Sequence, residues 1–460
     1  MSIVYAMCVP HPPLIIPEVG KGQEKGIQTT IDSYEAVMKK AASFHPDLVI
    51  ITSPHSIMYS DYIHISPGAS ARGDFGSFGV PQVQISCKYD EVFVKELSAL
   101  CTDLGVPAGI LGERHKELDH ATMIPLYFLQ HYIQGFKVVR IGISGLSPLM
   151  HYRFGQAIRK ISDDLGRKVV FIASGDLSHK LKEDGPYGYA SEGPQFDSDI
   201  TQAFESGDFM RFLTFSPDFC EEAAECGLRS FQIMAGALDR TSVISHLYSY
   251  EGPFGVGYGV AGFELHGFDA SRDIGDQYEV KRRKELQKIK EQEDAYVQLA
   301  RFTSEHYIKE GIKPHMPSHP QEMDERQAGV FVTLHKEGAL RGCIGTFQPT
   351  TSSIAEEIMQ NAISACAHDP RFPPVEEDEL EDLIYSVDVL GEVEDIDDIN
   401  ALDPQRYGVI VTSGMKRGLL LPDLEGVDTV MKQVDIARNK AGIHEGEPIQ
   451  LARFEVVRHT

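Results

Sequence analysis

The chain has few cysteines for its 460 residues, and those present lack the spacing of a disulfide framework or a zinc knuckle. They are scattered singly, at Cys8, Cys87, Cys101, Cys220, Cys226, Cys343 and Cys366. Structural disulfides are typical of oxidising compartments, where paired cysteines are common. The pattern therefore predicts reduced thiols and a cytoplasmic protein.

Positive charge is also scarce. Lys and Arg number 43 against 68 Asp and Glu, for a formal net charge of -25 at pH 7. Nucleic acid backbones and anionic lipids are bound mainly through clustered Lys and Arg, so general binding to either is not expected. One basic run, 281–288, could mark an RNA contact, but a solvated helix face explains such runs more often.

Long apolar runs are missing as well. The first residues show no basic region followed by an apolar stretch, and Asp and Glu interrupt every other candidate span. We expect neither export nor insertion into a membrane. What remains is an ordinary globular composition, with 42% hydrophobic and 24% charged residues.

The length predicts two domains, because a single core rarely grows beyond about 250 to 300 residues. Apolar strand patterns give way to a polar and then highly charged stretch at residues 268–288. We therefore expect one domain over residues 1–267, a charged linker and helix over 268–288, and a second domain over 289–460.

The first domain has the pattern of an α/β fold, with a mostly parallel sheet flanked by helices. Apolar runs rich in Val and Ile predict buried strands at 3–9, 47–52, 137–145 and 168–174. Helical patterns at 27–44 and 90–104 suit crossover helices between parallel strands. A glycine-rich run, 255–265, is predicted to be a strand that closes the sheet.

The second domain is predicted to be a compact α+β unit. Residues 328–335 and 339–345 flank a short glycine-containing turn typical of a hairpin, and a second hairpin is expected within 407–421. Helical patterns cover 353–367 and 427–441.

Histidines follow the predicted strands of the first domain. His11 comes just after the first strand and His55 just after the second. The carboxyl ends of parallel strands share one edge of the sheet, where α/β proteins place their ligands, so these two imidazoles are expected to meet. Taken alone, each histidine is more often an ordinary loop or core residue.

Two further histidines make packing alone a poor explanation. Asp119 has the features of a helix N-cap, which would place His120 in the first turn of a helix. The run Ser174-Gly175-Asp176-Leu177-Ser178-His179 again ends a strand. The four histidines therefore predict a functional cleft at one end of the sheet.

These motifs resemble the catalytic subunit of class III extradiol ring-cleavage dioxygenases and the related Memo proteins, over about residues 1–265. The resemblance implies His11 and His55 as metal ligands, with His120 and His179 beside the metal. It also implies Fe(II) as the cofactor and a cleavage of catechol rings with O2. In that reaction His179 would be the acid/base, His120 would hydrogen-bond oxygen or substrate, and Asp176 would orient His179.

The third metal ligand has two candidates, Glu225 and Cys226. Glu225 would complete the two-histidine, one-carboxylate set of the dioxygenases, whereas Cys226 matches the Cys-Gly pattern of the Memo branch. A thiolate would suit copper or zinc as well as iron. The register slightly favours Cys226. A third interpretation is that both residues merely begin a helix.

From about residue 290 the chain resembles the AMMECR-one domain family, whose blocks appear in order at 340–346, 361–374, 418–422 and 440–443. The family brings no established reaction. Arg341 and Arg371 could clamp an anion, and Cys343 could be a nucleophile beside His368. The alternative is structural, with Cys343 buried and Arg341 paired with Asp369.

Memo-like and AMMECR-one-like domains occur together in a set called the AmmeMemoRadiSam system, which implies a radical S-adenosylmethionine protein as partner. We expect an iron-dependent dioxygenase or related oxidoreductase acting on a phenolic or other chelating small molecule. The alternative is a non-catalytic metal-dependent protein that recognises a modified small molecule, peptide or RNA. The sequence is compatible with an oligomer.

Overall fold

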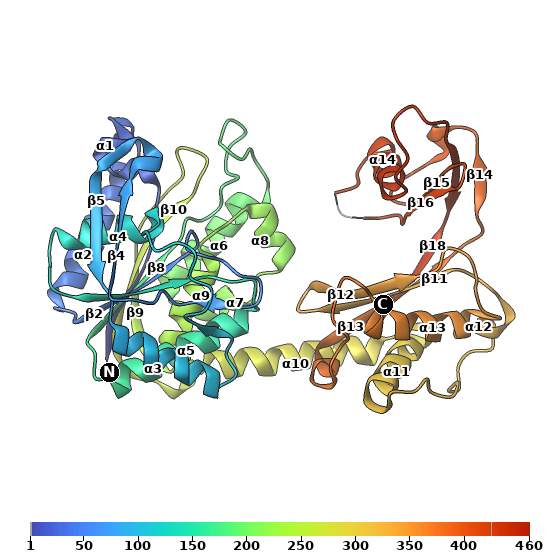
Figure 1. Cartoon of the computed structure of the whole chain (residues 1–460), viewed down its shortest axis with the longest axis horizontal. Helices are drawn as coiled ribbons and strands as arrows, with labels where there is room; N and C mark the ends of the chain where they lie inside the picture. Colours follow the sequence, from blue (N-terminus) through green and yellow to red (C-terminus); the bar gives the residue numbers. More distant parts are fainter. Residues whose placement is uncertain (1, 425) are drawn as a thin grey trace. The chain divides into compact units, whose positions relative to one another are not determined.

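The computed structural model describes residues 2–424 and 426–460 and divides into two compact units, Met1–Lys281 and Arg282–Thr460 (Figure 1). The segment predicted to be a charged linker and helix contains a short 3-10 turn, η4 (Ala270–Arg272), and most of α10 (Ile274–Gln292). The division between the units falls within α10. Among the described residues, no helix has both the length and the apolar character needed to cross a membrane.

A six-stranded sheet forms the centre of the first unit, in the order β7-β2-β8-β1-β10-β9. Four neighbouring strands are parallel: β7 (Lys137–Gly142), β2 (Leu48–Ser53), β8 (Val169–Ser174) and β1 (Ile3–Val9). They match the predicted apolar runs, and their near-complete burial explains why those runs are continuous rather than alternating. The predicted α/β class is confirmed.

The glycine-rich strand does not close the sheet, so that prediction was wrong. It forms β10 (Tyr258–Phe268), which pairs antiparallel with β1 on one side and with β9 (Thr241–Glu251) on the other. The edge strand is β9, whose residues are mostly half-buried or exposed. The first half of β10 is fully buried because an internal strand is covered on both faces.

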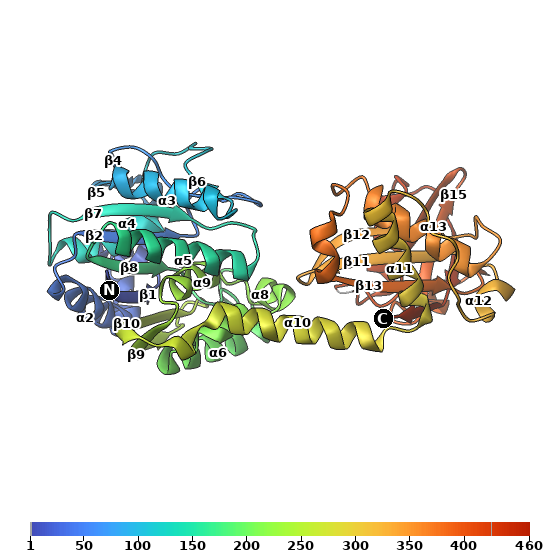
Figure 2. The same cartoon turned by 90° about the horizontal axis from the view of Figure 1, so that it is seen from below.

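Helices cover both faces of this sheet, as Figure 2 shows. Successive strand residues face opposite sides, so Met7 belongs to one core and Cys8 to the other. Two helices pack on the Met7 side, α2 (Gln28–Ser43) and α4 (His120–Gln130). The Cys8 side is covered mainly by α3 (Glu91–Asp103), α5 (Pro148–Asp164) and α9 (Leu228–Ala237). The carboxyl ends of β1, β2 and β8 remain together at one edge.

The second unit contains two four-stranded antiparallel sheets, in the orders β12-β11-β13-β18 and β14-β17-β15-β16. Both predicted hairpins are present, as β11 (Val330–Lys336) with β12 (Ala339–Gly345) and β15 (Gly408–Ser413) with β16 (Lys416–Leu420). The other strands are β13 (Leu383–Leu390), β14 (Glu394–Ile396), β17 (Gln450–Phe454) and β18 (Val456–His459). The longer helices that cover these sheets are α11 (Ala295–Glu310) and α13 (Ile354–Ala367) on the first sheet and α14 (Val430–Lys440) on the second.

Candidate metal centre

Two histidines and one cysteine converge beyond the ends of β1 and β2. His11 follows β1 and His55 follows β2, and their Nε2 atoms lie 3.0 Å apart. The Sγ atom of Cys226 lies 3.7 Å from Nε2 of His11. One donor atom from each of the three residues lies within 4.8 Å of the others. The structure thus brings together three side chains whose donor atoms could hold one metal ion.

Cys226 reaches this position through a tight turn between two helices. α8 (Pro217–Ala223) is followed by its C-cap, Ala224, which has a left-handed backbone conformation with a φ of 51°. Cys226 follows, and α9 begins two residues later at Leu228. The turn directs the thiol toward His11 and toward the backbone carbonyl of Asp176, 3.7 Å from Sγ.

Glu225 lies outside this cluster, and its contact with the start of α9 explains why. Its Oε2 atom accepts a hydrogen bond of 2.7 Å from the backbone N–H of Leu228, an otherwise unpaired donor in the first turn of the helix. The carboxylate therefore stabilises the start of α9. Of the two candidates for the third ligand, the structure places Cys226 rather than Glu225 beside the histidines.

Burial sets the protonation of the cluster. It lowers the pKa of His11 well below its ordinary value, an effect increased by the nearby His55, His120 and His179. Burial also lowers the pKa of His55. Both imidazoles are consequently neutral near pH 7, the form that coordinates metals. Burial raises the pKa of the Cys226 thiol well above its ordinary value, so this thiol must lose a proton when a metal binds.

The buried carboxylate of Asp176 positions His11. Its Oδ1 accepts a 2.7 Å hydrogen bond from the backbone N–H of His11, and its Oδ2 lies 3.9 Å from Nε2 of that ring. The other ring nitrogen, Nδ1, is 3.1 Å from the hydroxyl oxygen of Ser174. Partners of this kind fix the orientation of a metal-binding imidazole. Burial raises the pKa of Asp176 to about 7.

Asp176 was expected to orient His179, and the structure gives His179 another partner. Nδ1 of His179 lies 2.6 Å from the backbone carbonyl oxygen of Ala224, which can only accept a hydrogen bond. The neutral ring therefore carries its proton on Nδ1 and keeps the lone pair of Nε2 free. Burial lowers the pKa of His179, which favours this neutral form. The Asp176 carboxylate instead accepts a hydrogen bond from the backbone N–H of His11, which follows β1.

His120 completes the cluster from the start of α4. Its ring centroid is 4.3 Å from that of His55 and 5.4 Å from that of His11. Asp119 is the N-cap, as predicted, and accepts a 2.9 Å hydrogen bond from Thr122 N. The same carboxylate accepts a 2.6 Å hydrogen bond from the hydroxyl of Ser53, at the end of β2. This contact ties the His55 and His120 segments together.

Three contributors to the site were missed at the level of sequence. The rings of Phe78 and Tyr187 stand edge-on to His120 and His179, with centroid distances of 5.4 and 5.2 Å. Asp197 accepts a 2.8 Å hydrogen bond from the backbone N–H of Ser178 and so fixes the residue before His179. Exposed aromatic residues in loops were a usable signal for the first two, whereas no local pattern marks Asp197.

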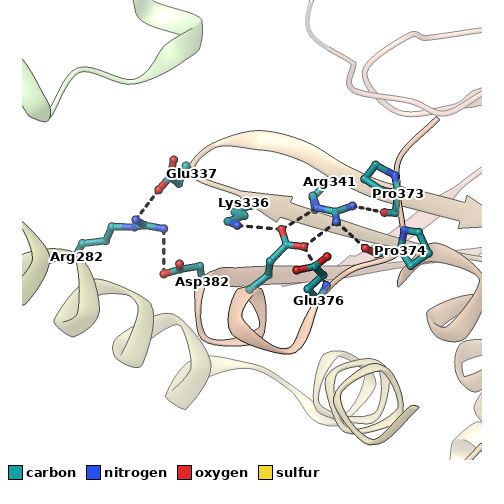
Figure 3. Close-up of polar contacts among 9 residues, drawn as sticks. Arg282, Lys336, Glu337, Arg341, Pro373, Pro374, Glu376 and Asp382 are labelled. Atoms are coloured by element: carbon teal, nitrogen blue, oxygen red, sulfur yellow. Dashed lines mark hydrogen bonds and ion pairs between the residues drawn. The ribbon is translucent and has the colours of Figure 1, made fainter. Parts of the chain in front are cut away.

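In the second unit, Arg341 is bound within the protein rather than free to clamp an anion (Figure 3). It makes two hydrogen bonds to the carboxylate of Glu379, of 3.0 and 2.8 Å, and two to the carbonyl oxygens of Pro373 and Pro374. Lys336 shares the same carboxylate at 2.9 Å. The predicted anion clamp is therefore wrong for Arg341, and so is its proposed pairing with Asp369.

Arg371, not Arg341, pairs with Asp369, through contacts of 3.0 and 2.7 Å, and donates to the backbone carbonyl of Cys343 at 2.8 Å. The side-chain partner of Cys343 is the hydroxyl of Thr333, 3.3 Å from Sγ. His368 instead has its ring edge-on to Tyr307. These contacts support a structural role for Arg371, Asp369 and Cys343. His368 contacts Tyr307 and is not the base that would activate the Cys343 thiol.

Comparisons with known proteins match both units. The model of the catalytic LigB subunit of aromatic ring-opening dioxygenase matches residues 5–261, and the AMMECR1 model matches residues 297–459. Protein CA_C1420 of Clostridium acetobutylicum is 41% identical over 468 aligned residues, covering 100% of this chain and 99% of its own length. A Thermotoga maritima protein is 52% identical over 171 residues, which are 36% of this chain and 98% of that protein.

Among solved structures, protein PH0010 from Pyrococcus horikoshii is 32% identical, with a TM-score of 0.33, and the match covers 35% of this chain and 88% of that one. The family assignment depends on the two family models and on the full-length relative. Through its first unit the chain belongs to the family of the catalytic LigB subunit of aromatic ring-opening dioxygenases, and an AMMECR1 domain follows in its second unit.

Proposed function

We propose that the chain is a metal-dependent oxidoreductase that uses O2 to oxidise a phenolic or similarly chelating small molecule. The observation that carries this proposal is the convergence of His11, His55 and Cys226, with their donor atoms within 4.8 Å of one another. Membership of the LigB family supports the reaction type. The reaction would take place in the first unit, and the small molecule would bind beside His120 and His179.

The donor set suits a transition metal. Two neutral imidazoles and a thiol are intermediate to soft ligands, which fit Fe(II) and also copper or zinc. The family favours iron, and a bound iron would supply both a Lewis acid and an electron-transfer centre. His11, held by Asp176 and Ser174, is the most rigidly oriented of the three ligands.

His179 is the residue best arranged to move a proton. Its Nδ1 is held at the Ala224 carbonyl, so Nε2 can accept a phenolic proton and later return it. His120 lies against both ligand rings and would hydrogen-bond the substrate or its oxygen. The rings of Phe78 and Tyr187 offer edges against which an aromatic substrate could pack.

Cys226 also favours a second candidate function. The third donor of the cluster is a thiol rather than the carboxylate that ring-cleaving dioxygenases use, and a thiolate binds copper or zinc tightly. The second candidate is therefore a metal-dependent binding protein that recognises a chelating molecule without oxidising it.

Metal analysis of protein purified without oxygen, followed by oxygen-uptake measurements with a panel of catechols, separates the two candidates. Stoichiometric iron with uptake that depends on substrate supports the oxidoreductase. Stoichiometric metal without uptake, together with tight binding of a catechol, supports the binding protein. His55→Ala is the comparison variant, and its folding is checked against that of the parent chain. If the two are equally well folded and the parent chain takes up no transition metal, both candidate functions are overturned.

A further inference from the structure

The first unit contains a cavity that is separate from the metal centre. Its volume is about 880 Å³, within the usual range for small-molecule sites. It lies among the hairpin of β4 (Ser70–Phe75) and β5 (Val80–Lys88), the loop before α4, and the turn between α4 and β7. None of the three candidate metal ligands lines it.

The charge of this cavity is opposite to that of the whole chain. Four basic side chains line it, Arg72, Lys88, Lys116 and Lys137, against one carboxylate, Glu117. Lys137 has Asp90 as a partner, 3.6 Å from its Nζ. Within the described ranges, the other three make no ion pair or hydrogen bond through their side chains. Glu117 and Asp90 offset part of this positive charge, and Lys116 is also attracted to Glu113. An excess of positive charge remains around the cavity, in a chain with a net charge of -25, and it favours an anionic occupant.

The register of the hairpin places two of these cations on one face. Arg72 is opposite Ser86 and Lys88 is opposite Ser70, so the four side chains share a face of the antiparallel pair. Arg72 and Lys88 are diagonal neighbours there, at a spacing of about 7 Å. Their repulsion would be relieved by an anion between them. A guanidinium with flanking hydroxyls is also a good set of donors for phosphate or carboxylate oxygens.

The opposite wall is held in place by hydrogen bonds. The buried guanidinium of Arg140 donates to the carbonyl oxygens of Glu117 at 2.6 Å and His115 at 3.1 Å, so it fixes the loop that carries Lys116. The side-chain amide of Gln130 donates to the carbonyl of Ser86 at 3.0 Å and fastens α4 to β5. A cavity whose walls are already fixed loses little entropy when a ligand binds.

We propose that this cavity binds a small organic anion, bearing a phosphate or two carboxylates, through Arg72, Lys88 and Lys116. The half-buried Phe136 gives the cavity an apolar side against which the carbon skeleton of the ligand packs. This site is distinct from the metal centre and does not depend on the oxidoreductase proposal.

Titration calorimetry of the full chain, with glycerol 3-phosphate, succinate and uncharged glycerol as probes, tests the site. At least one of the two anions is expected to bind with a stoichiometry of one, more weakly as salt increases, while glycerol does not bind. Binding of glycerol 3-phosphate would identify a phosphate as the recognised group, and binding of succinate would identify a dicarboxylate. Arg72→Gln and Lys116→Gln should each weaken binding about tenfold, the loss of one charge-assisted contact.

Lys95→Gln is the matched control, because it removes one exposed lysine of α3 outside the cavity. If Lys95→Gln weakens anion binding as much as Arg72→Gln does, binding reflects net charge alone and the proposal is overturned. The proposal is also overturned if neither anion binds. His55→Ala should keep the anion affinity of the parent chain. Loss of anion binding in that variant would assign the anion to the metal centre and contradict a separate site.

Discussion

The backbones of Gly175 and Gly227 are in direct contact. A Cβ atom added to Gly175 would lie 2.1 Å from the Cα atom of Gly227, far closer than two carbon atoms can approach. Gly175 follows β8 and Gly227 precedes α9, so this contact brings the strand end that carries Asp176 against the turn that carries Cys226. Without it, the thiol and His11 would not share one site.

Gly175→Ala should therefore impair metal binding although the substituted residue has no ligand atom. The added methyl group must displace the 225–227 turn, and loss of the groups that orient metal ligands typically lowers metal affinity by about 10 to 100-fold. Affinity can be measured by competition with a chelator, and circular dichroism checks that the sheet is intact. An unchanged affinity in a folded variant would contradict this account of the turn.

Cys226→Ala and Glu225→Gln separate the two candidates for the third ligand. Cys226→Ala should lower metal affinity at least about a hundredfold, because it removes a donor atom of the cluster. Glu225→Gln should keep the metal and lose about 1 kcal/mol of stability, since its contact is with the first turn of α9. Metal content and thermal unfolding measure the two effects. The reverse pattern would make Glu225 the ligand.

His179→Gln should retain the metal and lose turnover. Its ring is proposed to transfer a proton, a role worth about 10² to 10⁴-fold in rate. Metal content and oxygen uptake are measured on the same preparation. His131→Gln, at an exposed position after α4, is the matched control and should leave both values unchanged. Loss of the metal in His179→Gln would assign His179 to the ligand set instead.

The pKa of Glu379 predicts how the second unit responds to acid. Burial alone would raise this pKa, but hydrogen bonds from Arg341, the backbone of Glu376 and Lys336 outweigh it and lower the pKa from 4.5 to about 2. A carboxylate whose pKa is lowered by folding stabilises the protein fully above its ordinary pKa. That stability is lost as the pH falls from about 4.5 through about 2.

Glu379→Gln should remove the contribution of this carboxylate to the loss of stability at low pH. The variant is expected to be less stable than the parent near neutral pH, and the difference should shrink as the pH falls below 4.5. Hydrogen exchange of the β12 amides, followed against pH, reports on this unit within the full chain. Glu381→Gln, an exposed neighbour in the same segment, is the control. If the difference in stability between the parent chain and Glu379→Gln is the same at every pH, ionisation of the Glu379 carboxylate is not its source.

Local pattern was sufficient for most of the fold. Buried parallel strands are continuous apolar runs, so β1 and β2 could be placed within a residue or two, and His11 and His55 with them. The position of β10 inside the sheet could not be predicted, because only its pairing with β9 makes it internal. An alternating, partly exposed segment such as β9 gives a weaker signal.

Side-chain partners distant in sequence were the main source of error. Arg341 finds its carboxylate in Glu379, 38 residues later, and nothing near either residue indicates the other. Asp176 contacts His11 across 165 residues rather than the nearby His179. The sequence identified which residue types gather at the strand ends, whereas the geometry was needed to separate Cys226 from Glu225.

The thiol of the half-buried Cys226 also determines how the centre withstands oxidation. Thiolates are oxidised much faster than thiols, and burial keeps the free Cys226 protonated. Metal binding removes that proton and with it this protection. Oxidation to a sulfinic acid then replaces a soft sulfur donor with hard oxygens and changes which metals the site prefers. Exposure to air during purification would thus alter the ligand set itself, and mass spectrometry of the peptide containing Cys226 records that change.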